Sequence, residues 1–458
     1  MSLSRAMSPA LKPLAGALVL AFGAMGAQAQ SLSEVVQAAR SVDATYLGAR
    51  SSADAAHYRY EQSRSVLLPT AGLQVQAARS DNASPTIGVD ATGAPVVFNE
   101  TVKTTSLGAT VNAQQNIYNR ANSLNIDQAQ KNDDIAQSQL AQADQDLIVR
   151  VAQAYFNVLA AADALTSVQG NSKAIAEQLA SAKRNFEVGN ATITDTREAE
   201  ARADLAHSKE IAAENDLLVA RLSLDQLAGR NGVTPHPLIL PAVLPPVMPS
   251  QASDWVALAE SDSEVLRQAR IGLEVAELQT AKARAGHLPT LVANATYGRT
   301  RAHEAIDGEG ALTGNNRNGG VSVTLNVPIF SGFLIQNQVN EAAALERKAR
   351  TDAEGTHTQV VLGARTAFVN AQSQAAQVKA LEASEASSKL ALDATVLGYK
   401  VGVKVNLDVL NAQSQLYQTQ TDAAGARYNF LMSQLKLRQA AGNLTNNDLL
   451  PIDALLAR

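Results

Sequence analysis

The sequence predicts a mainly α-helical protein that also carries a membrane β-barrel, and three observations lead to this prediction. Two long regions repeat their apolar residues with an average period of 3.5, which is typical of coiled-coil helices. Four short segments alternate apolar and polar residues with a period of two, as strands do. The helical region also occurs twice in fixed register, because three pairs of matching residues are each 213 positions apart: Gly189 and Gly402, Asp195 and Asp408, Gly229 and Gly442. A repeat in constant register indicates a duplicated structural unit.

The composition narrows the classes of protein to consider. The chain has 458 residues, of which 46% are apolar but only 4% aromatic, so elongated helices are favoured over a compact globule. The net charge is -5 and the charges are interspersed, which predicts no nucleic-acid partner. The sequence has no cysteine, which excludes disulfides, thiolate metal sites, a cysteine nucleophile and an acylated N-terminal cysteine.

Residues 1–29 have the pattern of a secretory signal peptide. Arg5 and Lys12 supply the positive region, and the apolar run from Leu14 to Met25 follows them. A small residue on each side of Gln28 forms the expected cleavage site, so the mature chain is predicted to begin at Gln30. No later run reaches the roughly 20 apolar residues of a membrane helix, and none is expected.

The first structural repeat is expected to span residues 30–234. It opens with a helix over 31–64, followed by strands over 67–78 and 104–115. A polar loop over 80–103 is predicted between the strands.

A helical hairpin over 119–228 completes this repeat. Its tip turn is placed at Gly189, and Gly170 is expected to interrupt the first helix. Thr192 and Asp195 form a candidate capping box at the start of the return helix, and Gly229 is the expected C-cap.

A proline-rich stretch over 235–250 is predicted to be a stiff linker. The second repeat, 251–445, follows the same order as the first, and residues 446–458 form a tail. Its elements are expected to be a helix over 254–285, strands over 289–299 and 319–328 around a loop at 301–318, and a helical hairpin over 334–441.

The alternating segments favour a membrane pore. Each has one apolar and one uncharged polar face, and the neighbouring long helices have no free apolar face with which to cover it. In lipid, only a closed sheet satisfies its backbone hydrogen bonds, and four strands cannot close. Several chains must therefore share one barrel. The alternative is a soluble alanine-rich bundle with a small sheet.

Both hairpin tips resemble the TolC family of outer-membrane channel proteins. The tips read Phe186-Glu187-Val188-Gly189 and Tyr399-Lys400-Val401-Gly402, and the segment 326–332, Asn-Val-Pro-Ile-Phe-Ser-Gly, joins a strand to a helix as in that family. The resemblance covers residues 30–445. It implies a homotrimer with a shared 12-strand barrel in the outer membrane, a coiled-coil helical tunnel in the periplasm, and a small mixed belt around that tunnel.

The same resemblance implies a periplasmic gate at the tips. Links between Thr194 and Asp195 on the first hairpin and Tyr399 and Lys404 on the second would hold the tunnel shut. The family's archetype has arginine at the position of Lys404, and lysine makes a weaker point-charge contact. The alternative role for Asp195 is that of a simple helix-capping acid.

A second implied feature is a ring of carboxylates in the tunnel. Three copies of Asp408 would line the lumen and attract cations. Asn411 stands where the archetype has a second aspartate, so one ring is expected instead of two. Gly189 and Gly402 provide the tip turns.

The function implied by this resemblance is a passive exit duct for a tripartite efflux or type I secretion system. Its partners would be a periplasmic adaptor, an inner-membrane pump or ABC exporter, and outer-membrane lipid; the cargo would be small toxic compounds or an unfolded protein. A periplasmic coiled-coil adaptor without a pore is the alternative.

No motif supports an enzyme, a cofactor site or a metal site. Gly308, Gly310 and Gly314 only approach a dinucleotide fingerprint, with the wrong spacing, and are assigned to an extracellular loop. The six histidines have no ligand spacing. Trp255 is expected to anchor the belt by packing.

Overall fold

The computed structural model of the protein describes residues 30–189, 191–241, 244–306 and 310–456. The predicted signal peptide, 1–29, lies outside these residues. The chain divides into two compact units. The helical unit contains the described residues of Met1–Ser51, Ser138–Arg267 and Gly355–Arg458, and the sheet unit contains Ser52–Gln137 and the described residues of Gln268–Glu354.

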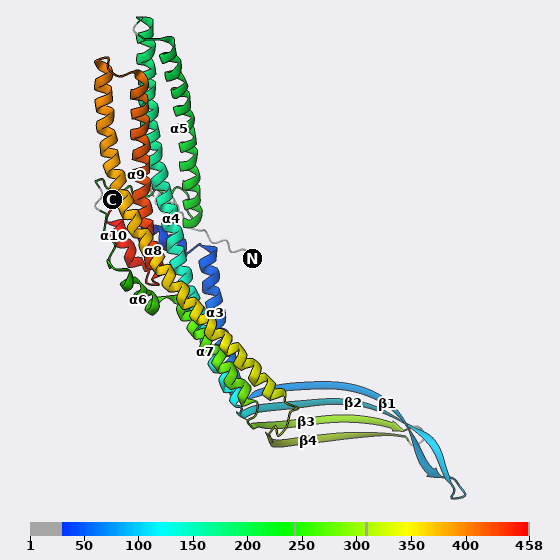
Figure 1. Cartoon of the computed structure of the whole chain (residues 1–458). Coiled ribbons are helices and arrows are strands. Elements are labelled where there is room, and N and C mark those ends of the chain that lie inside the picture. Colours follow the sequence, from blue (N-terminus) through cyan, green and yellow to red (C-terminus); the bar gives the residue numbers. More distant parts are fainter. Residues whose placement is uncertain (1–29, 190, 242–243, 307–309, 457–458) are drawn as a thin grey trace, which may run out of the picture. The chain divides into compact units, whose positions relative to one another are not determined.

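Two long helical hairpins dominate the helical unit (Figure 1). In the first, α4 (Arg120–Glu187) is followed by α5 (Ile193–Ala228), and in the second, α8 (Leu334–Lys400) is followed by α9 (Asn406–Ala440). The predicted interruption at Gly170 is wrong, because α4 is continuous through it. A Cβ atom at Gly170 would lie only 2.8 Å from Cε1 of Tyr417 on α9. Glycine at this position therefore allows two helices to approach closely.

Each of the two shorter predicted helices is broken in the structure. The first consists of α2 (Leu32–Arg40) and α3 (Ala44–Arg64), which is followed by a 3-10 turn, η1 (Ser65–Leu67). The second consists of α6 (Ala252–Asp262) and α7 (Glu264–Ala285). At the breaks, Asp43 Oδ1 accepts from the backbone N–H of Tyr46 (2.8 Å) and Ser263 Oγ from that of Leu266 (3.3 Å). Short polar side chains thus start new helices inside stretches whose apolar pattern reads as continuous.

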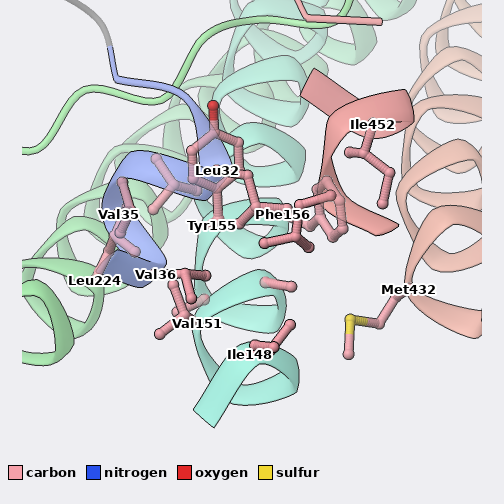
Figure 2. Packing of buried hydrophobic residues seen from close by; sticks show 14 of the residues in the cluster. Leu32, Val35, Val36, Ile148, Val151, Tyr155, Phe156, Leu224, Met432 and Ile452 are labelled. Carbon is pink, nitrogen blue, oxygen red and sulfur yellow. The ribbon is translucent and has the colours of Figure 1, made fainter. Parts of the chain in front are cut away.

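The main core of the helical unit is shown in Figure 2. Residues from α2, the middle of α4, α5 and α9 pack together there, and Tyr155 and Phe156 are the largest of the fully buried side chains. The Tyr155 hydroxyl donates to the carbonyl of Gln30 (2.9 Å) and accepts from the backbone N–H of His236 (2.8 Å). Burial raises the pKa of this phenol.

The C-terminal tail belongs to this core. It forms η2 (Asn446–Leu449) and the short helix α10 (Leu450–Asp453). Leu449, Ile452 and Leu456 are buried in the cluster. The carboxylate of Asp453 accepts from the first backbone N–H groups of α2, at 2.8 Å from Leu32 and 3.3 Å from Ser33. The last helical turn of the chain thus caps its first described helix.

One stretch of α4 is long and apolar enough to cross a membrane by length and composition. Half of that stretch is buried inside the protein. Val151, Tyr155 and Phe156 of the same helix contribute to the main core. These features are typical of a core helix.

The proline-rich segment lies against other parts of the helical unit. Leu238 forms a bridge with Leu456 of the tail. The carbonyl of Pro245 accepts from Nε2 of Gln434 on α9 (2.7 Å). Trp255, at the start of α6, is buried, and its Nε1 donates to the carbonyl of Pro249 (2.9 Å). It packs in a cluster with residues of α8 and α9.

The sheet unit contains one antiparallel sheet with the order β1-β2-β3-β4 (Figure 1). Its strands are β1 (Thr70–Val89), β2 (Pro95–Tyr118), β3 (Thr290–Ile306) and β4 (Gly310–Asn326). A mainly helical chain with a strand sheet, as predicted, is thereby confirmed.

The predicted loops at 80–103 and 301–318 are wrong. β1 and β2 remain paired as far as Val89 and Pro95, and β3 and β4 as far as Ile306 and Gly310. Gly310 and Gly314 therefore lie in a strand, whereas Gly308 is outside the described residues. The outer halves of these strands carry few apolar residues, so they give no alternation signal. Backbone pairing continues nonetheless, because it does not depend on the side chains.

The sheet has two chemically different faces. The register pairs odd-numbered residues with odd-numbered residues across all four strands, apart from one bulge near Tyr118. The odd-numbered residues form what we call the odd face, and the even-numbered residues form the even face. The odd face carries large apolar side chains that are between 47% and 82% exposed: Leu73, Val75, Leu107, Val111, Tyr297, Val321, Val323 and Leu325. The even face carries Thr, Ser, Asn, Gln and Gly at the same heights.

Candidate functional site: the hairpin tips

The tips of the two helical hairpins are built alike. Gly189 and Gly402 both have φ of +79°, which an L side chain adopts only with strain. Their N–H groups bond to the carbonyls of Phe186 and Tyr399, each at 3.0 Å. No atom lies within 4 Å of where a Cβ would stand at either glycine, so backbone conformation alone requires glycine there.

Asp195 lies at the start of α5 and caps it. Its Oδ2 accepts from the backbone N–H of Thr192 (3.0 Å) and from the Thr192 hydroxyl (2.8 Å). The Thr192 hydroxyl in turn accepts from the N–H of Asp195 (3.2 Å). The predicted capping box is confirmed. Thr194, between the two, is exposed.

Asp408 occupies the matching position of α9. Its Oδ2 accepts from the N–H of Val405 at 3.4 Å, but valine cannot return the bond as Thr192 does. Lys404 Nζ lies 3.5 Å from the same oxygen. Both side chains are more than a third exposed, so this ion pair contributes little to stability. It does bring together a residue expected in the gate and one expected in the lumen ring.

In the half of the hairpins that ends at the tips, three side-chain hydrogen bonds between described residues join the first hairpin to the second. Asn185 Nδ2 on α4 donates to the Tyr399 hydroxyl on α8 at 3.4 Å, which is a long hydrogen bond. Farther from the tip, Arg202 Nη2 on α5 donates to Oδ1 of Asn411 on α9 at 3.2 Å. The third contact is a short one between Gln178 on α4 and the buried Asn406 at the start of α9.

The four residues expected in the gate do not bond directly to one another across the two hairpins of one chain. In the described part of this chain, Thr194 and Asp195 form no hydrogen bond or ion pair with Tyr399 or Lys404. Tyr399 instead meets Asn185, which sequence reasoning missed. The repeat contains no signal for such pairs, because they depend on how far one helix is shifted along another.

A buried tyrosine–aspartate pair lies between the two hairpins, nearer to the main core than the tip contacts are. The Tyr428 hydroxyl on α9 donates to Oδ2 of Asp163 on α4 (2.7 Å). Burial raises the pKa of the Asp163 carboxyl, while the hydrogen bond from Tyr428 opposes this effect. Burial also raises the pKa of Tyr428 itself. Beside it, Arg427 Nε lies 3.0 Å from Oε1 of Glu382 on α8, so polar contacts connect three of the long helices.

Among the residues that the structure describes, no group of three or more His, Asp or Glu side chains could hold a metal ion.

Comparisons with known proteins agree with this architecture. Residues 28–230 and 255–443 match the family described as "Outer membrane efflux protein". The outer membrane protein TolC of Vibrio cholerae is 31% identical over 431 residues, which are 93% of this chain and 94% of that protein. AprF of Pseudomonas aeruginosa, an alkaline protease secretion protein, is 30% identical over 67% of this chain and 63% of its own length.

The fold is shared with solved structures as well. The outer membrane protein VceC of Vibrio cholerae superposes with a TM-score of 0.72 at 18% identity, covering 90% of this chain and 96% of that one. The predicted family is confirmed, and with it the location in the outer membrane, extending into the periplasm. The chain belongs to the outer membrane efflux protein family.

Proposed function

We propose that three copies of this chain form a passive exit duct, in which their sheets close into one 12-strand barrel and their helical hairpins form a periplasmic tunnel. The duct has no energy source of its own. An inner-membrane pump or ABC exporter would drive transport, and a periplasmic adaptor would dock at the tips. The cargo is either small toxic compounds or an unfolded protein, in line with the efflux family to which the chain belongs and with its similarity to a protease secretion protein.

The odd face of the sheet carries this proposal. Its apolar side chains are exposed in the single chain, Val321 by as much as 82%. Such a face needs a hydrocarbon environment, and a spanning sheet must close so that no edge is left unpaired. The strands have 17 to 24 residues, more than the roughly 10 that a tilted strand needs to cross a bilayer. A periplasmic adaptor, the competing function, has no use for this face.

We also propose that the tips form the gate. The Tyr399–Asn185 contact supports a link between the hairpins, and Asp195 and Lys404 lie at the same end of the unit. In a trimer, Thr194 and Asp195 of one copy would be free to meet Tyr399 or Lys404 of another. Asp408 would form the ring in the lumen.

Planar-bilayer recording tests the duct. Purified mature protein in detergent, added to one side of a bilayer, is expected to insert spontaneously and give uniform conductance steps. If the protein is a periplasmic adaptor, it should be soluble without detergent and give no conductance steps. That result would contradict the proposed duct. Cross-linking of the same preparation should stop at trimers.

The ring makes a prediction of its own. Asp408→Ala should weaken block of the channel by trivalent cations by about an order of magnitude, because three carboxylates are lost at one level. Lys404→Gln should strengthen the block, since Lys404 partly neutralises Asp408 in the structure. Equal block in wild type and both variants would contradict the ring. Asp393→Asn on the exposed surface of α8 is the matched control.

A further inference from the structure

The basic residues of the sheet are distributed unevenly between its two faces. The described residues of the four strands contain five lysines and arginines, and all of them lie on the odd face: Arg79, Lys103, Arg299, Arg301 and Arg317. Of the three acids in these strands, Glu100 and Glu304 lie on the even face. A solvated surface would scatter both signs over both faces.

Three of these arginines occupy neighbouring positions on β3 and β4, and we call them the arginine cluster: Arg299, Arg301 and Arg317. Arg299 is directly opposite Arg317 in the β3–β4 register. Arg301 follows Arg299 on the same face, about 7 Å farther along the strand. A hydrogen bond between His303 Nδ1 and Thr313 Oγ1 (2.9 Å) shows that odd-numbered side chains of β3 and β4 meet on this face.

Within the part of the chain that the structure describes, the cluster has no acidic partner on the odd face of β3 or β4. Like charges directly opposite one another destabilise a sheet. The one acid on the odd face of the described strands, Asp81, lies 3.7 Å from Arg79 on β1. Within the described residues, none of the three arginines forms an ion pair, and all three are exposed. Such an arrangement would be stabilised by an anion bound from outside the protein.

The position of the cluster along the strands indicates which anion. On β3, the odd-face residues from Leu291 to Tyr297 are apolar or aromatic, and Arg299 comes next. Arg299 lies about 27 Å along the strand from Leu291, or about 20 Å in height when the strand is tilted by about 40°. An outer-membrane barrel has an apolar band about 25 Å tall, bordered by aromatic residues.

The cluster lies at the far edge of this band. The near ends of β3 and β4 are the ones that connect to α7 and α8, and in an outer-membrane protein of this family the helices extend into the periplasm. The arginines therefore reach the headgroup level of the outer leaflet.

We propose that the arginine cluster binds a phosphorylated lipid headgroup of the outer leaflet. The inference rests on the proposed barrel, in which the odd face meets lipid. Guanidinium groups bind phosphate through paired hydrogen bonds, and three of them at neighbouring positions of one sheet face suit a headgroup with more than one phosphate. A bound lipid of this kind would neutralise the cluster and hold the barrel at a fixed depth.

The test measures lipid binding by the purified full-length protein in neutral detergent. The probes are lipopolysaccharide, the same lipid after chemical removal of its phosphates, and inorganic phosphate. Retained lipid is quantified by native mass spectrometry and by the rise in melting temperature. Wild type should bind the phosphorylated lipid, lose at least about tenfold in affinity on dephosphorylation, and show no competition from millimolar free phosphate.

The key variant is Arg299→Gln/Arg301→Gln/Arg317→Gln, which should also lose at least about tenfold in affinity. The same three positions changed to lysine keep the charge and should retain most of the binding. Thr300→Gln/Asn316→Gln on the even face is the matched control for the fold. If the glutamine variant fails to accumulate, Arg301→Gln alone should still weaken binding.

Two outcomes would overturn the inference. Equal binding by wild type and the triple glutamine variant would show that the arginines do not hold the lipid. Competition by millimolar free phosphate would indicate that the cluster binds a soluble anion instead. Conductance in planar bilayers is recorded for every variant, so failure of the duct itself, with no conductance even in wild type, is distinguished from failure of the lipid site.

Discussion

Asp195 shows how one residue can support two interpretations. In the structure it caps α5 through Thr192, which needs only a hydrogen-bond acceptor. A latch to a neighbouring hairpin would need its negative charge. Because the two roles depend on different properties of the carboxylate, two substitutions can separate them.

We expect Asp195→Ala and Tyr399→Phe each to raise single-channel conductance about twofold or more, because each removes a polar group of the proposed gate. Asp195→Asn is the discriminating variant, since an amide oxygen can still cap the helix but carries no charge. A conductance like that of Asp195→Ala would support the latch. A conductance like that of wild type would assign Asp195 to capping alone.

Asp43 predicts a pH dependence of stability. Arg150 donates to both of its carboxylate oxygens at 2.9 Å, and this contact holds the pKa of Asp43 below its usual value of 3.8. A depressed pKa means that the stabilisation is present above pH 3.8 and is lost as the pH falls through the folded-state value.

Asp43→Asn should therefore lower stability at pH 7 by about 1–3 kcal/mol. The difference from wild type should shrink as the pH falls below 3.8, where wild type also loses the charge. Melting temperatures from circular dichroism at several pH values measure this. Asp393→Asn is the control, and a constant difference at every pH would contradict the assignment.

At the scale of elements, the C-terminal ends of α5 and α9 depend on glycine. Gly229 and Gly442 follow the two return helices with φ of +64° and +78°. A Cβ at Gly442 would lie 2.5 Å from the backbone of both Asp262 and Ser263. Backbone atoms cannot rotate away as a side chain can. The break between α6 and α7 therefore packs directly against Gly442 and leaves no room for a side chain there.

Gly442→Ala should destabilise the protein by more than about 3 kcal/mol, since it adds left-handed strain to a steric clash. Gly189→Ala has the same strain, at φ of +79°, but open space around the new methyl group, and should cost about 1–2 kcal/mol. The yield of protein in the outer membrane and its melting temperature give the comparison. Equal losses in the two variants would contradict the role assigned to Asp262 and Ser263.

The sequence predicts elements well where a pattern of side chains specifies them. The inner halves of the strands alternate clearly, as in Val321, Val323 and Leu325, and they are strands in the structure. The outer halves carry few apolar residues and these do not alternate regularly, so the sequence pattern predicts loops there. The break at Ser263 is not predicted, because a single capping side chain does not change the apolar periodicity of the sequence. The contact of Asn185 with Tyr399 is not predicted either, because it depends on the relative shift of two helices.

At the scale of the whole molecule, the exposed apolar side chains of the odd face favour a membrane environment over water. Val323 is 60% exposed near the middle of the apolar band. Val323→Lys should cost about 2–4 kcal/mol in the membrane and reduce assembly in the outer membrane. Ser322→Lys, the next residue on the even face, should assemble normally. The amount of assembled protein in the outer-membrane fraction measures both effects, and equal assembly of the two variants would contradict the assignment of the odd face to lipid.

The contact between Asp453 and the start of α2 has a consequence for biogenesis. Secretion delivers the amino end of a polypeptide first, so Leu32 and Ser33 cross the inner membrane more than 400 residues before their capping carboxylate does. The main core of the helical unit, to which Leu449, Ile452 and Leu456 contribute, can therefore be completed only when translocation is complete. Nascent chains truncated before Leu449 should accordingly remain substrates for periplasmic chaperones and proteases.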